Sequence, residues 1–177
     1  MKLSVISPAY NEEASIEATV LAFHETLKLE KINHEILVVN DNSKDSTEKI
    51  LNKLSKKVKE IRYVNNTPPN GFGFAVRWGL ENFTGDCVAL VTADMSDRPV
   101  DLVAYFRKME TGKYDCVFGS RFIKGGKVID YPKNKIFLNR LTNNIIKFLF
   151  GIRYNDTTNA FKAYRREVLQ DVRIYGD

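Results

Sequence analysis

The sequence predicts an α/β protein built on a parallel, doubly wound sheet. Short apolar runs, typical of strands buried on both faces, alternate with stretches in which apolar residues recur at helical spacing. The connections are short, which favours right-handed crossovers between parallel strands. With 177 residues, 44% of them hydrophobic, the chain suits about one domain. Its apolar runs are far shorter than the roughly 20 residues of a membrane-spanning helix.

The first strand and the first helix have clear boundaries. A short strand is expected over residues 3–7, LSVIS, with Pro8 ending it. Apolar residues then recur every three or four positions over 16–27, which predicts a helix with Ser15 as its N-cap.

The next elements continue the alternation. Residues 36–39 are continuously apolar, as expected of a strand buried on both faces, and a polar turn over 40–45 ends it. Apolar residues within 50–58 mark the second helix. Residues 61–64 form the third expected strand, and the Pro, Gly and Asn content of 65–73 predicts a loop.

Two more strand–helix steps complete the predicted sheet. A helix is expected to contain residues 75–80, followed by a strand over 88–91. A helix over 102–109 and a fifth strand over 116–118 come next.

The pattern changes after residue 121. Residues 124–127 form a basic, glycine-containing segment, and 135–150 predict a very apolar helix that also carries Lys and Arg. Residues 155–164 are polar, and 165–169 indicate the start of another helix. No clear terminal element follows, so we expect a fragment or a short form that lacks a C-terminal extension.

Positive charge is concentrated in the last third of the chain. The net charge is +5. Residues 1–120 hold 15 Lys and Arg against 17 Asp and Glu, a net −2, whereas residues 121–177 hold 12 against 5, a net +7. Such a balance suits a nucleic acid, a membrane surface or a phosphorylated substrate. Nucleic acid is the least favoured, because the basic residues accompany a large apolar surface and not an aromatic stacking groove.

Several common site types are not predicted. Cys87 and Cys116 lack metal-ligand spacing and are expected to be small apolar residues beside buried strands. His24 and His34 have no Cys or His partner at ligand spacing. A Walker A loop is absent, which argues against P-loop NTPases. The turn after the first strand, residues 8–13, contains no glycine, which argues against NAD enzymes.

The ends of the expected strands point to another kind of nucleotide site. Parallel sheets bind ligands beyond the carboxyl ends of their strands. Those ends carry carboxylates and small polar groups, at residues 8–12, 40–43, 92–97 and 119–121. Asp94 is suited to Mg²⁺, which usually takes one or two carboxylates together with phosphate oxygens. The alternative for Asp94 is a turn or a helix-cap role.

Five segments give the chain a specific resemblance. They are SPAYNE (7–12), NDNSKDST (40–47), TADMS (92–96), GSRF (119–122) and DTTNAFKAYRR (156–166). In this order the chain resembles the inverting family-two glycosyltransferases, most closely the dolichol-phosphate mannose synthase and polyprenyl-phosphate glycosyltransferase branch. The resemblance implies a GT-A, Rossmann-like fold, with a mostly parallel sheet flanked by helices on both faces. It also implies a C-terminal amphipathic helical segment on the acceptor side.

The resemblance also assigns roles to residues. Residues 1–177 would form a single catalytic domain, with 1–120 as the nucleotide-sugar part and 121–177 as the acceptor part. The nucleotide-sugar pocket would be lined by Pro8, Tyr10, Glu12, Val39, Asp41, Ala93 and Asp94. In it, Asp41 would bond the base or ribose and Tyr10 would pack near the base.

The catalytic and acceptor-side roles fall on few residues. Asp94 would be the metal ligand, for Mg²⁺ or Mn²⁺, and with Arg121 it would be catalytic. The acceptor phosphate would meet Arg121, Lys135 and Asn139. The alternatives are a surface salt bridge for Arg121 and a solvated helix face for Lys135.

The sequence departs from the family pattern at identifiable positions. The Asp-x-Asp metal motif is reduced to Thr92-Ala93-Asp94, which weakens the expectation of metal dependence. Asn40 replaces the first of the paired aspartates before Asp41, and Lys162 stands where Arg is common, losing the bidentate fork of Arg.

The implied reaction moves a hexose, mannose or glucose, from a GDP- or UDP-linked sugar to a polyprenyl or dolichyl phosphate with inversion. An ionised phosphate needs no general base, so the enzyme mainly positions donor and acceptor and stabilises the leaving diphosphate. The expected location is peripheral, at the cytoplasmic face of a membrane. The helix over 135–150 could be its membrane contact, or instead core or an oligomer interface.

Two other functions stay open. A hydroxyl acceptor in polysaccharide or cell-envelope glycan synthesis would need a base, for which Asp97 is the available carboxylate unless it caps the helix that begins at Pro99. The reduced metal motif is also compatible with a non-catalytic nucleotide-sugar or membrane-binding module.

Overall fold

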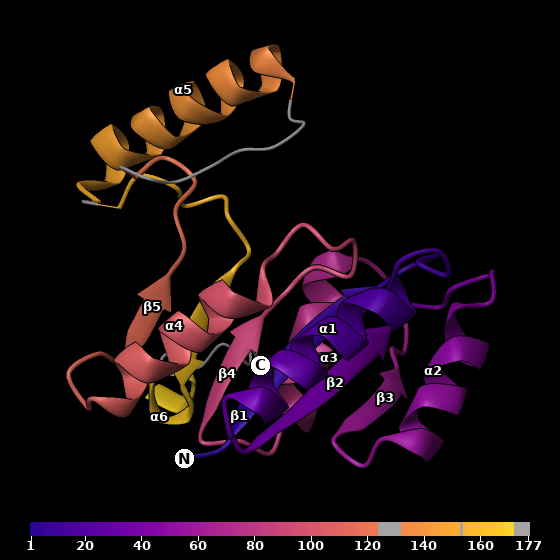
Figure 1. Ribbon diagram of the computed structural model, residues 1–177. Coiled ribbons are helices and arrows are strands. Elements are labelled where there is room, and N and C mark those ends of the chain that lie inside the picture. The colour runs from indigo at the N-terminus through magenta and orange to yellow at the C-terminus, as the bar shows by residue number, and fades with distance from the viewer. Residues whose placement is uncertain (124–131, 153, 172–177) are drawn as a thin grey trace. The chain divides into compact units, whose positions relative to one another are not determined.

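The computed structural model describes residues 1–123, 132–152 and 154–171 (Figure 1). The expected basic segment 124–127 lies outside these residues. The elements follow in the order β1 (Leu3–Ala9), α1 (Ile16–Leu29), β2 (His34–Asn40), α2 (Thr47–Lys57), β3 (Ile61–Asn65), α3 (Phe72–Asn82), β4 (Cys87–Leu90), α4 (Pro99–Glu110), β5 (Cys116–Phe118), α5 (Lys133–Phe150), β6 (Lys162–Arg165) and α6 (Arg166–Asp171).

The sheet is mostly parallel, as the sequence predicted. Its six strands lie in the order β3-β2-β1-β4-β6-β5. β1 pairs in parallel with both β2 and β4, and β2 pairs in parallel with β3. The strand order therefore reverses beside β1, and the carboxyl ends of β1, β2 and β4 meet at one edge of the sheet. Such a reversal point is where doubly wound sheets bind their ligands.

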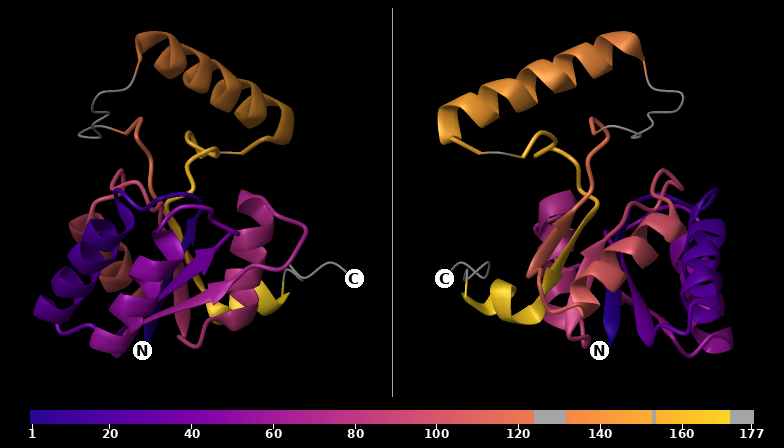
Figure 2. Two further views of the ribbon diagram at one scale, coloured as in Figure 1. Left: turned by 90° about the vertical axis from the view of Figure 1, so that its right-hand side faces the viewer. Right: turned by 60° about the vertical axis from the view of Figure 1, so that its left-hand side comes forward.

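Helices cover both faces of the sheet (Figure 2). On one face α1, α2 and α4 pack over a core cluster that contains Leu3, Val5, Ile36 and Val38. On the other face α3 and α6 pack over a second cluster that contains Ile6. Successive residues of one strand thus enter different clusters, because side chains of a strand alternate between its faces. Burial on both faces explains the continuous apolar run over residues 36–39 of β2.

β6 was not predicted. The polar residues 155–164 predict no strand, whereas Lys162–Arg165 form a strand that pairs antiparallel with β4 and separates it from β5. Four residues with one buried side chain, that of Ala163, give little periodic signal. The strand is instead specified by long-range contacts, among them the packing of Phe161 on Tyr105 with ring centroids 4.6 Å apart.

The chain divides into two compact units. The first contains Met1–Val117 together with the segment that starts at Phe161, and the second contains Phe118–Ala160. The segment after residue 160 therefore groups with the nucleotide-sugar part of the expected division, through its pairing with β4. The single catalytic domain over 1–177 stays a prediction.

Candidate functional site

The loops after β1 and β2 are tied to each other at the carboxyl edge of the sheet. The Asn11 backbone N donates to Ser43 Oγ at 3.0 Å, and the Lys44 backbone N donates to Asn11 Oδ1 at 2.7 Å. Both loops turn through a left-handed asparagine, with φ of +56° at Asn11 and +60° at Asn42. Asparagine tolerates this conformation better than most residues, which explains its place at these two turns.

Asp41 links the β2 edge to the loop that follows β3. Asp41 is buried, with 6% of its surface exposed. Its Oδ1 accepts a hydrogen bond from Asn66 Nδ2 at 2.7 Å, and its Oδ2 accepts one from the Gly71 backbone N at 2.8 Å. Gly71 has a φ of +127°, a conformation that disfavours side chains, so a glycine is required for this contact. Asp41 is thus both a candidate nucleotide ligand and the anchor of the 66–71 loop.

The other expected donor-site residues of β1 and β2 differ in exposure. Tyr10 is 58% exposed, which leaves its ring accessible to a base. Pro8 and Glu12 are half-buried, and Glu12 Oε2 accepts from Ser15 Oγ at 2.8 Å at the start of α1. The Val39 side chain belongs to the second core cluster. Any contact between Val39 and a nucleotide would therefore use its backbone.

The loop after β4 presents one exposed carboxylate and one that closes the loop. Asp94 is exposed, and its Oδ1 accepts from the Ser96 backbone N at 3.0 Å. Asp97 Oδ2 accepts from the backbone N and the hydroxyl of Thr92, at 2.8 and 3.0 Å. The N-cap of α4 is Arg98, so Asp97 is not the helix cap that the sequence suggested. Ala93 is buried, and its carbonyl accepts from Thr19 Oγ1.

The environment of Asp94 favours its charged form. Burial opposes ionisation, but hydrogen bonds from Ser96 and Thr92 outweigh it and hold the pKa of Asp94 below its usual value. Met95 next to it has a φ of +63°, a costly conformation for a long side chain. Within the described ranges no group of three or more His, Cys, Asp or Glu side chains is placed to hold a metal ion. A metal at Asp94 would therefore need oxygens from a diphosphate, which fits the usual mode of Mg²⁺ binding.

In the second unit, Arg121 is held by a buried carboxylate. Its Nε and Nη2 donate to the two oxygens of Asp156 at 2.9 and 2.7 Å, and its backbone N also donates to Asp156. Asp156 is fully buried, whereas the Arg121 side chain is 28% exposed. The guanidinium carbon of Arg121 also lies 5.4 Å from the ring centroid of Phe122, and that of Arg140 lies 5.2 Å from it.

The loop around Asp156 is fastened to α5 by asparagines. The buried Asn143 Oδ1 accepts from the Thr157 backbone N and hydroxyl at 2.6 and 2.7 Å. Asn139 Oδ1 accepts from Thr158 Oγ1 at 3.0 Å. Arg121 Nη2 also donates to Thr158 Oγ1, at 3.4 Å. The Thr158 hydroxyl therefore links Asn139, an expected acceptor-phosphate residue, to the Arg121–Asp156 pair. Lys135 is exposed on α5.

α5 turns its apolar side chains to the outside of its own unit. Phe137, Leu138, Leu141, Ile145, Phe148 and Leu149 are all exposed, with Phe148 at 86%. They recur every three or four residues and so share one side of the helix, opposite the buried Asn143. In a core helix the apolar face points inward, whereas in α5 the apolar face is exposed and a polar residue, Asn143, is buried.

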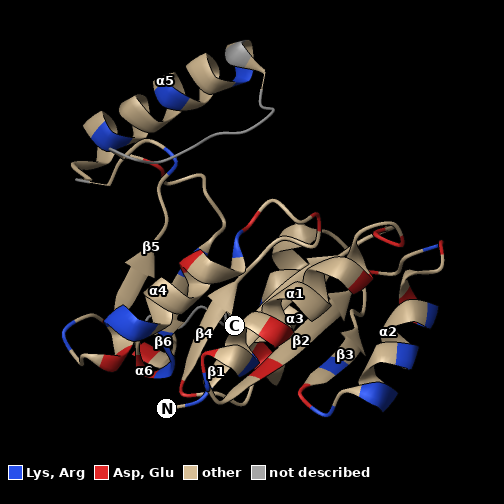
Figure 3. Cartoon of the chain, in the orientation of Figure 1, with Lys and Arg blue, Asp and Glu red and all other residues tan. Residues whose placement is uncertain are grey.

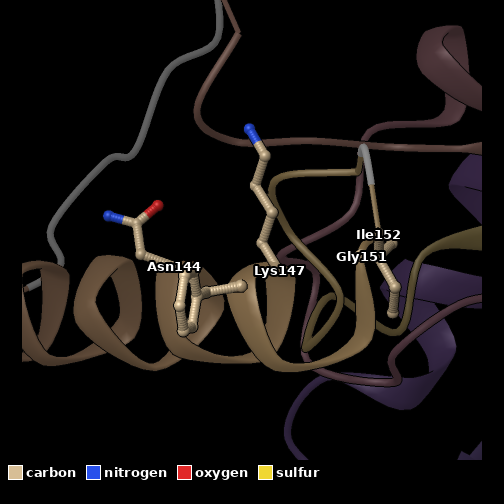
Figure 4. A pocket seen from close by; sticks show the side chains of 5 residues that line it. Asn144, Lys147, Gly151 and Ile152 are labelled. Carbon is tan, nitrogen blue, oxygen red and sulfur yellow. The ribbon is translucent and has the colours of Figure 1, made fainter.

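The C-terminal end of α5 borders a shallow hollow of about 480 Å³. Asn144, Lys147, Phe148, Gly151 and Ile152 line it, and Figure 4 shows Asn144 and Lys147 projecting from the same side of the helix. Lys and Arg also recur along α5 (Figure 3). Over the residues that the structure describes, no helix is long and apolar enough to cross a membrane.

Three residues of these networks were missed by the sequence analysis. Asn66, Asn143 and Asp156 each bond a candidate site residue or its loop. Asp156 lies in one of the family segments, and Asn66 lies in the predicted loop after the third strand. Their partners, Arg121 and Asp41, are 35 and 25 residues away, and a local sequence pattern does not identify contacts over such distances. Asn143 is one of several polar residues of α5, so the sequence does not show that it is the buried amide that needs hydrogen-bond partners.

The comparisons with known proteins all point to glycosyltransferases. The family model for glycosyl transferase family 2 matches residues 4–173. The dolichol-phosphate mannosyltransferase of Pyrococcus furiosus is 30% identical over 181 residues, which cover 98% of this chain and 49% of that protein. The polyprenol monophosphomannose synthase of Mycolicibacterium smegmatis is 31% identical over 175 residues, covering 96% and 64%. The chain thus spans about half to just under two thirds of the length of these relatives.

A solved structure shares the fold. Glucosyl-3-phosphoglycerate synthase from Mycobacterium tuberculosis, in complex with Mn²⁺, UDP and phosphoglyceric acid, superimposes with a TM-score of 0.73. The match covers 95% of this chain and 57% of that one, at 21% identity. At this identity the likeness establishes the fold, and it confirms the mixed α/β, mostly parallel architecture predicted from the sequence.

Proposed function

The chain belongs to glycosyl transferase family 2, and we propose that it moves a hexose, mannose or glucose, from a nucleotide diphosphate sugar to a polyprenyl phosphate with inversion. The names of the two curated relatives support a polyprenyl acceptor. The observation that carries the proposal is the outward apolar face of α5, on a helix that is bonded through Asn139 and Asn143 to the loop of Arg121 and Asp156. A lipid phosphate requires this combination of an apolar surface and a nearby cationic group.

The donor would bind at the carboxyl edge of β1, β2 and β4. Tyr10 would offer an exposed ring to the base, and Asp41 would accept a hydrogen bond from the base or ribose. The donor is expected to be GDP- or UDP-linked. The hydrogen bonds between the loops would hold these groups in place before the donor arrives, which lowers the entropic cost of positioning it.

Asp94 would stand at the diphosphate. Its exposed, ionised carboxylate can supply one oxygen ligand to Mg²⁺ or Mn²⁺, with the diphosphate supplying others. When bound, such a cation would offset negative charge that develops on the leaving diphosphate.

The acceptor phosphate would approach Arg121, Lys135 and Asn139. Asp156 fixes the guanidinium plane of Arg121, so the arginine would share its positive charge between this carboxylate and the phosphate. The phosphate oxygen would attack the anomeric carbon directly, and a single displacement inverts that carbon. No general base is required for an acceptor that is already ionised.

α5 would lie in the membrane–water boundary. Its apolar side chains would enter the lipid, and Lys135, Arg140 and Lys147 on the same helix would meet anionic headgroups. The protein would then be peripheral, at the cytoplasmic face where nucleotide sugars are available. Sedimentation with anionic liposomes tests this contact: Phe148→Glu with Phe150→Glu should abolish pelleting, with the exposed Leu29→Glu of α1 as control. Unchanged pelleting of the double variant would exclude the helix as the membrane contact.

The activity is tested with purified protein, GDP-mannose or UDP-glucose, polyprenyl phosphate, and Mg²⁺ or Mn²⁺. We expect a glycolipid product with inverted anomeric configuration. Asp94→Asn should lower its rate by about 10² or more, the range seen when a group stabilising transition-state charge is removed. The absence of product with every donor and cation would refute the proposal.

A hydroxyl acceptor is the second candidate, and the hydrogen bonds of Asp97 make it the less favoured one. The base that such an acceptor needs would have to be this carboxylate, but Asp97 closes the β4 loop through two hydrogen bonds from Thr92. Transfer to a soluble sugar hydroxyl that Asp97→Asn abolishes would reverse this choice. Binding of UDP or GDP without turnover would instead support a non-catalytic module.

A further inference from the structure

Five asparagines lie at the ends of β2 and β3 and in the loops that follow them, beside the candidate nucleotide site. Asn40 Nδ2 donates to Asn65 Oδ1 at 2.8 Å, and Asn42 Nδ2 donates to Asn70 Oδ1 at 2.8 Å. Between these pairs, Asn66 Nδ2 donates to Asp41 Oδ1 at 2.7 Å. The first of these hydrogen bonds joins the ends of β2 and β3, and the other two join the loops that follow them.

Asn66 is the most constrained member of this set. It is 5% exposed, its backbone N donates to the Asn40 carbonyl at 2.9 Å, and its carbonyl accepts from Asn42 Nδ2 at 3.2 Å. Its backbone is thus held by the residues on either side of Asp41. Because the backbone is fixed, the amide can direct its N–H at one oxygen of the carboxylate.

The Asp41 carboxylate keeps the capacity to bind a ligand. An ionised carboxylate has roughly four lone-pair positions, and the hydrogen bonds from Asn66 and Gly71 take one on each oxygen. These two donors determine the plane of the carboxylate and hence where its other lone pairs point. A hydrogen bond to a charged group is also stronger than one between neutral groups.

We infer that Asn66 is a positioning residue for nucleotide binding, which holds the Asp41 carboxylate in the orientation that a nucleoside diphosphate requires. This inference rests on the proposed function, since it takes Asp41 as the nucleotide ligand. Asn66 acts through Asp41 and needs no contact with the nucleotide itself. The pairing of Asn42 with Asn70 keeps the rim of the same loop closed.

Three variants separate positioning from general stability. Asn66→Ala removes the donor, and Asn66→Asp replaces it with an acid that can donate only when protonated. Asn65→Ala is the matched control, because Asn65 lies next in the chain and bonds Asn40 and Glu48 but not Asp41. Binding of UDP and GDP is measured by calorimetry from pH 5 to pH 8, with thermal unfolding recorded for each variant.

We expect Asn66→Ala to weaken nucleotide binding about tenfold, because a misdirected Asp41 carboxylate would lose about one hydrogen bond to the nucleotide. Asn65→Ala should stay within about twofold of wild type, because Asn65 bonds Asn40 and Glu48 and makes no hydrogen bond to Asp41. Asn66→Asp should bind poorly at pH 8, where two facing carboxylates repel, and recover toward pH 5 as the pair takes up a proton. Since the nucleotide phosphates also titrate, each value is divided by that of wild type at the same pH.

The outcomes distinguish the inference from the function on which it rests. Recovery of Asn66→Asp at low pH would support positioning, since a variant that had merely unfolded would not regain binding as the pH falls. The inference alone would be overturned if both Asn66 variants bound nucleotide as tightly as wild type at every pH. It would also be overturned if Asn65→Ala lost as much nucleotide affinity as Asn66→Ala. Wild-type protein that binds neither UDP nor GDP would overturn the proposed function and this inference together.

Discussion

Replacing Glu35 with Gln should destabilise the protein at neutral pH and much less in acid. Glu35 lies in β2, at the edge of the sheet opposite the candidate site, and is 5% exposed. Its Oε1 accepts from Ser4 Oγ and the Thr84 backbone N, and its Oε2 accepts from Arg62 Nε at 3.0 Å. One carboxylate therefore ties β1, β3 and the segment before β4 to β2.

The pKa of Glu35 gives the size of the effect. Burial alone would raise this pKa, but hydrogen bonds from Ser4, Thr84 and Arg62 outweigh burial and lower it from 4.5 to about 2. A depression of about 2.5 pKa units corresponds to about 3 kcal/mol, at 1.36 kcal/mol per unit. Because the folded-state pKa is the lower one, this stability is complete above pH 4.5 and is lost as the pH falls toward 2.

Urea denaturation at a series of pH values measures the difference between wild type and Glu35→Gln. We expect about 3 kcal/mol at pH 7 and a difference that shrinks steadily between pH 4.5 and pH 2. Glu81→Gln, an exposed carboxylate on α3, is the control and should change stability by less than about 0.5 kcal/mol. A Glu35→Gln deficit that is equally large at pH 7 and pH 2.5 would refute the electrostatic explanation and leave packing as the cause.

Two other substitutions test the packing and the ion pair. Gly79→Ala should lower the free energy of unfolding in urea by about 1–3 kcal/mol, because the added Cβ would lie 2.6 Å from Ile6 Cγ2. Gly73→Ala, in the same helix, is the control: its Cβ would meet nothing within 4 Å, so it should be neutral or stabilising. Equal effects of the two variants would contradict overpacking. Asp156→Asn should cost about 3 kcal/mol, measured by limited proteolysis of the second unit as a faster cleavage rate, because it leaves Arg121 without its buried partner. Asp115→Asn, with a side chain 77% exposed, is its control, and an unchanged cleavage rate in Asp156→Asn would show that the pair is dispensable.

The sequence predicted the elements that bury apolar side chains with a regular period. β1 and β2 could be located from short runs rich in apolar residues, and the helices of the first unit from their period, because both signals are local. β6 could not, since its four residues depend on pairing with β4, more than 70 positions earlier. The same limit applies to the site. Asp41 and Arg121 were identifiable from their motifs, but Asn66 and Asp156 were not, because their partners are set by the folded chain.

The distribution of positive charge shows why a charge count alone is a poor guide to partners. Arg121 belongs to the basic last third of the chain, but it forms an ion pair within its own unit with the buried Asp156. Conversely, α2 exposes Lys49, Lys53 and Lys56 although residues 1–120 are net negative (Figure 3). What distinguishes α5 is that its Lys and Arg side chains share a helix with an exposed apolar face. A polyanion would be attracted to either helix, but binding to an anionic lipid surface would also gain from burial of the exposed apolar side chains of α5. Salt should therefore weaken binding of this protein to vesicles without abolishing it, because the apolar contribution is not screened.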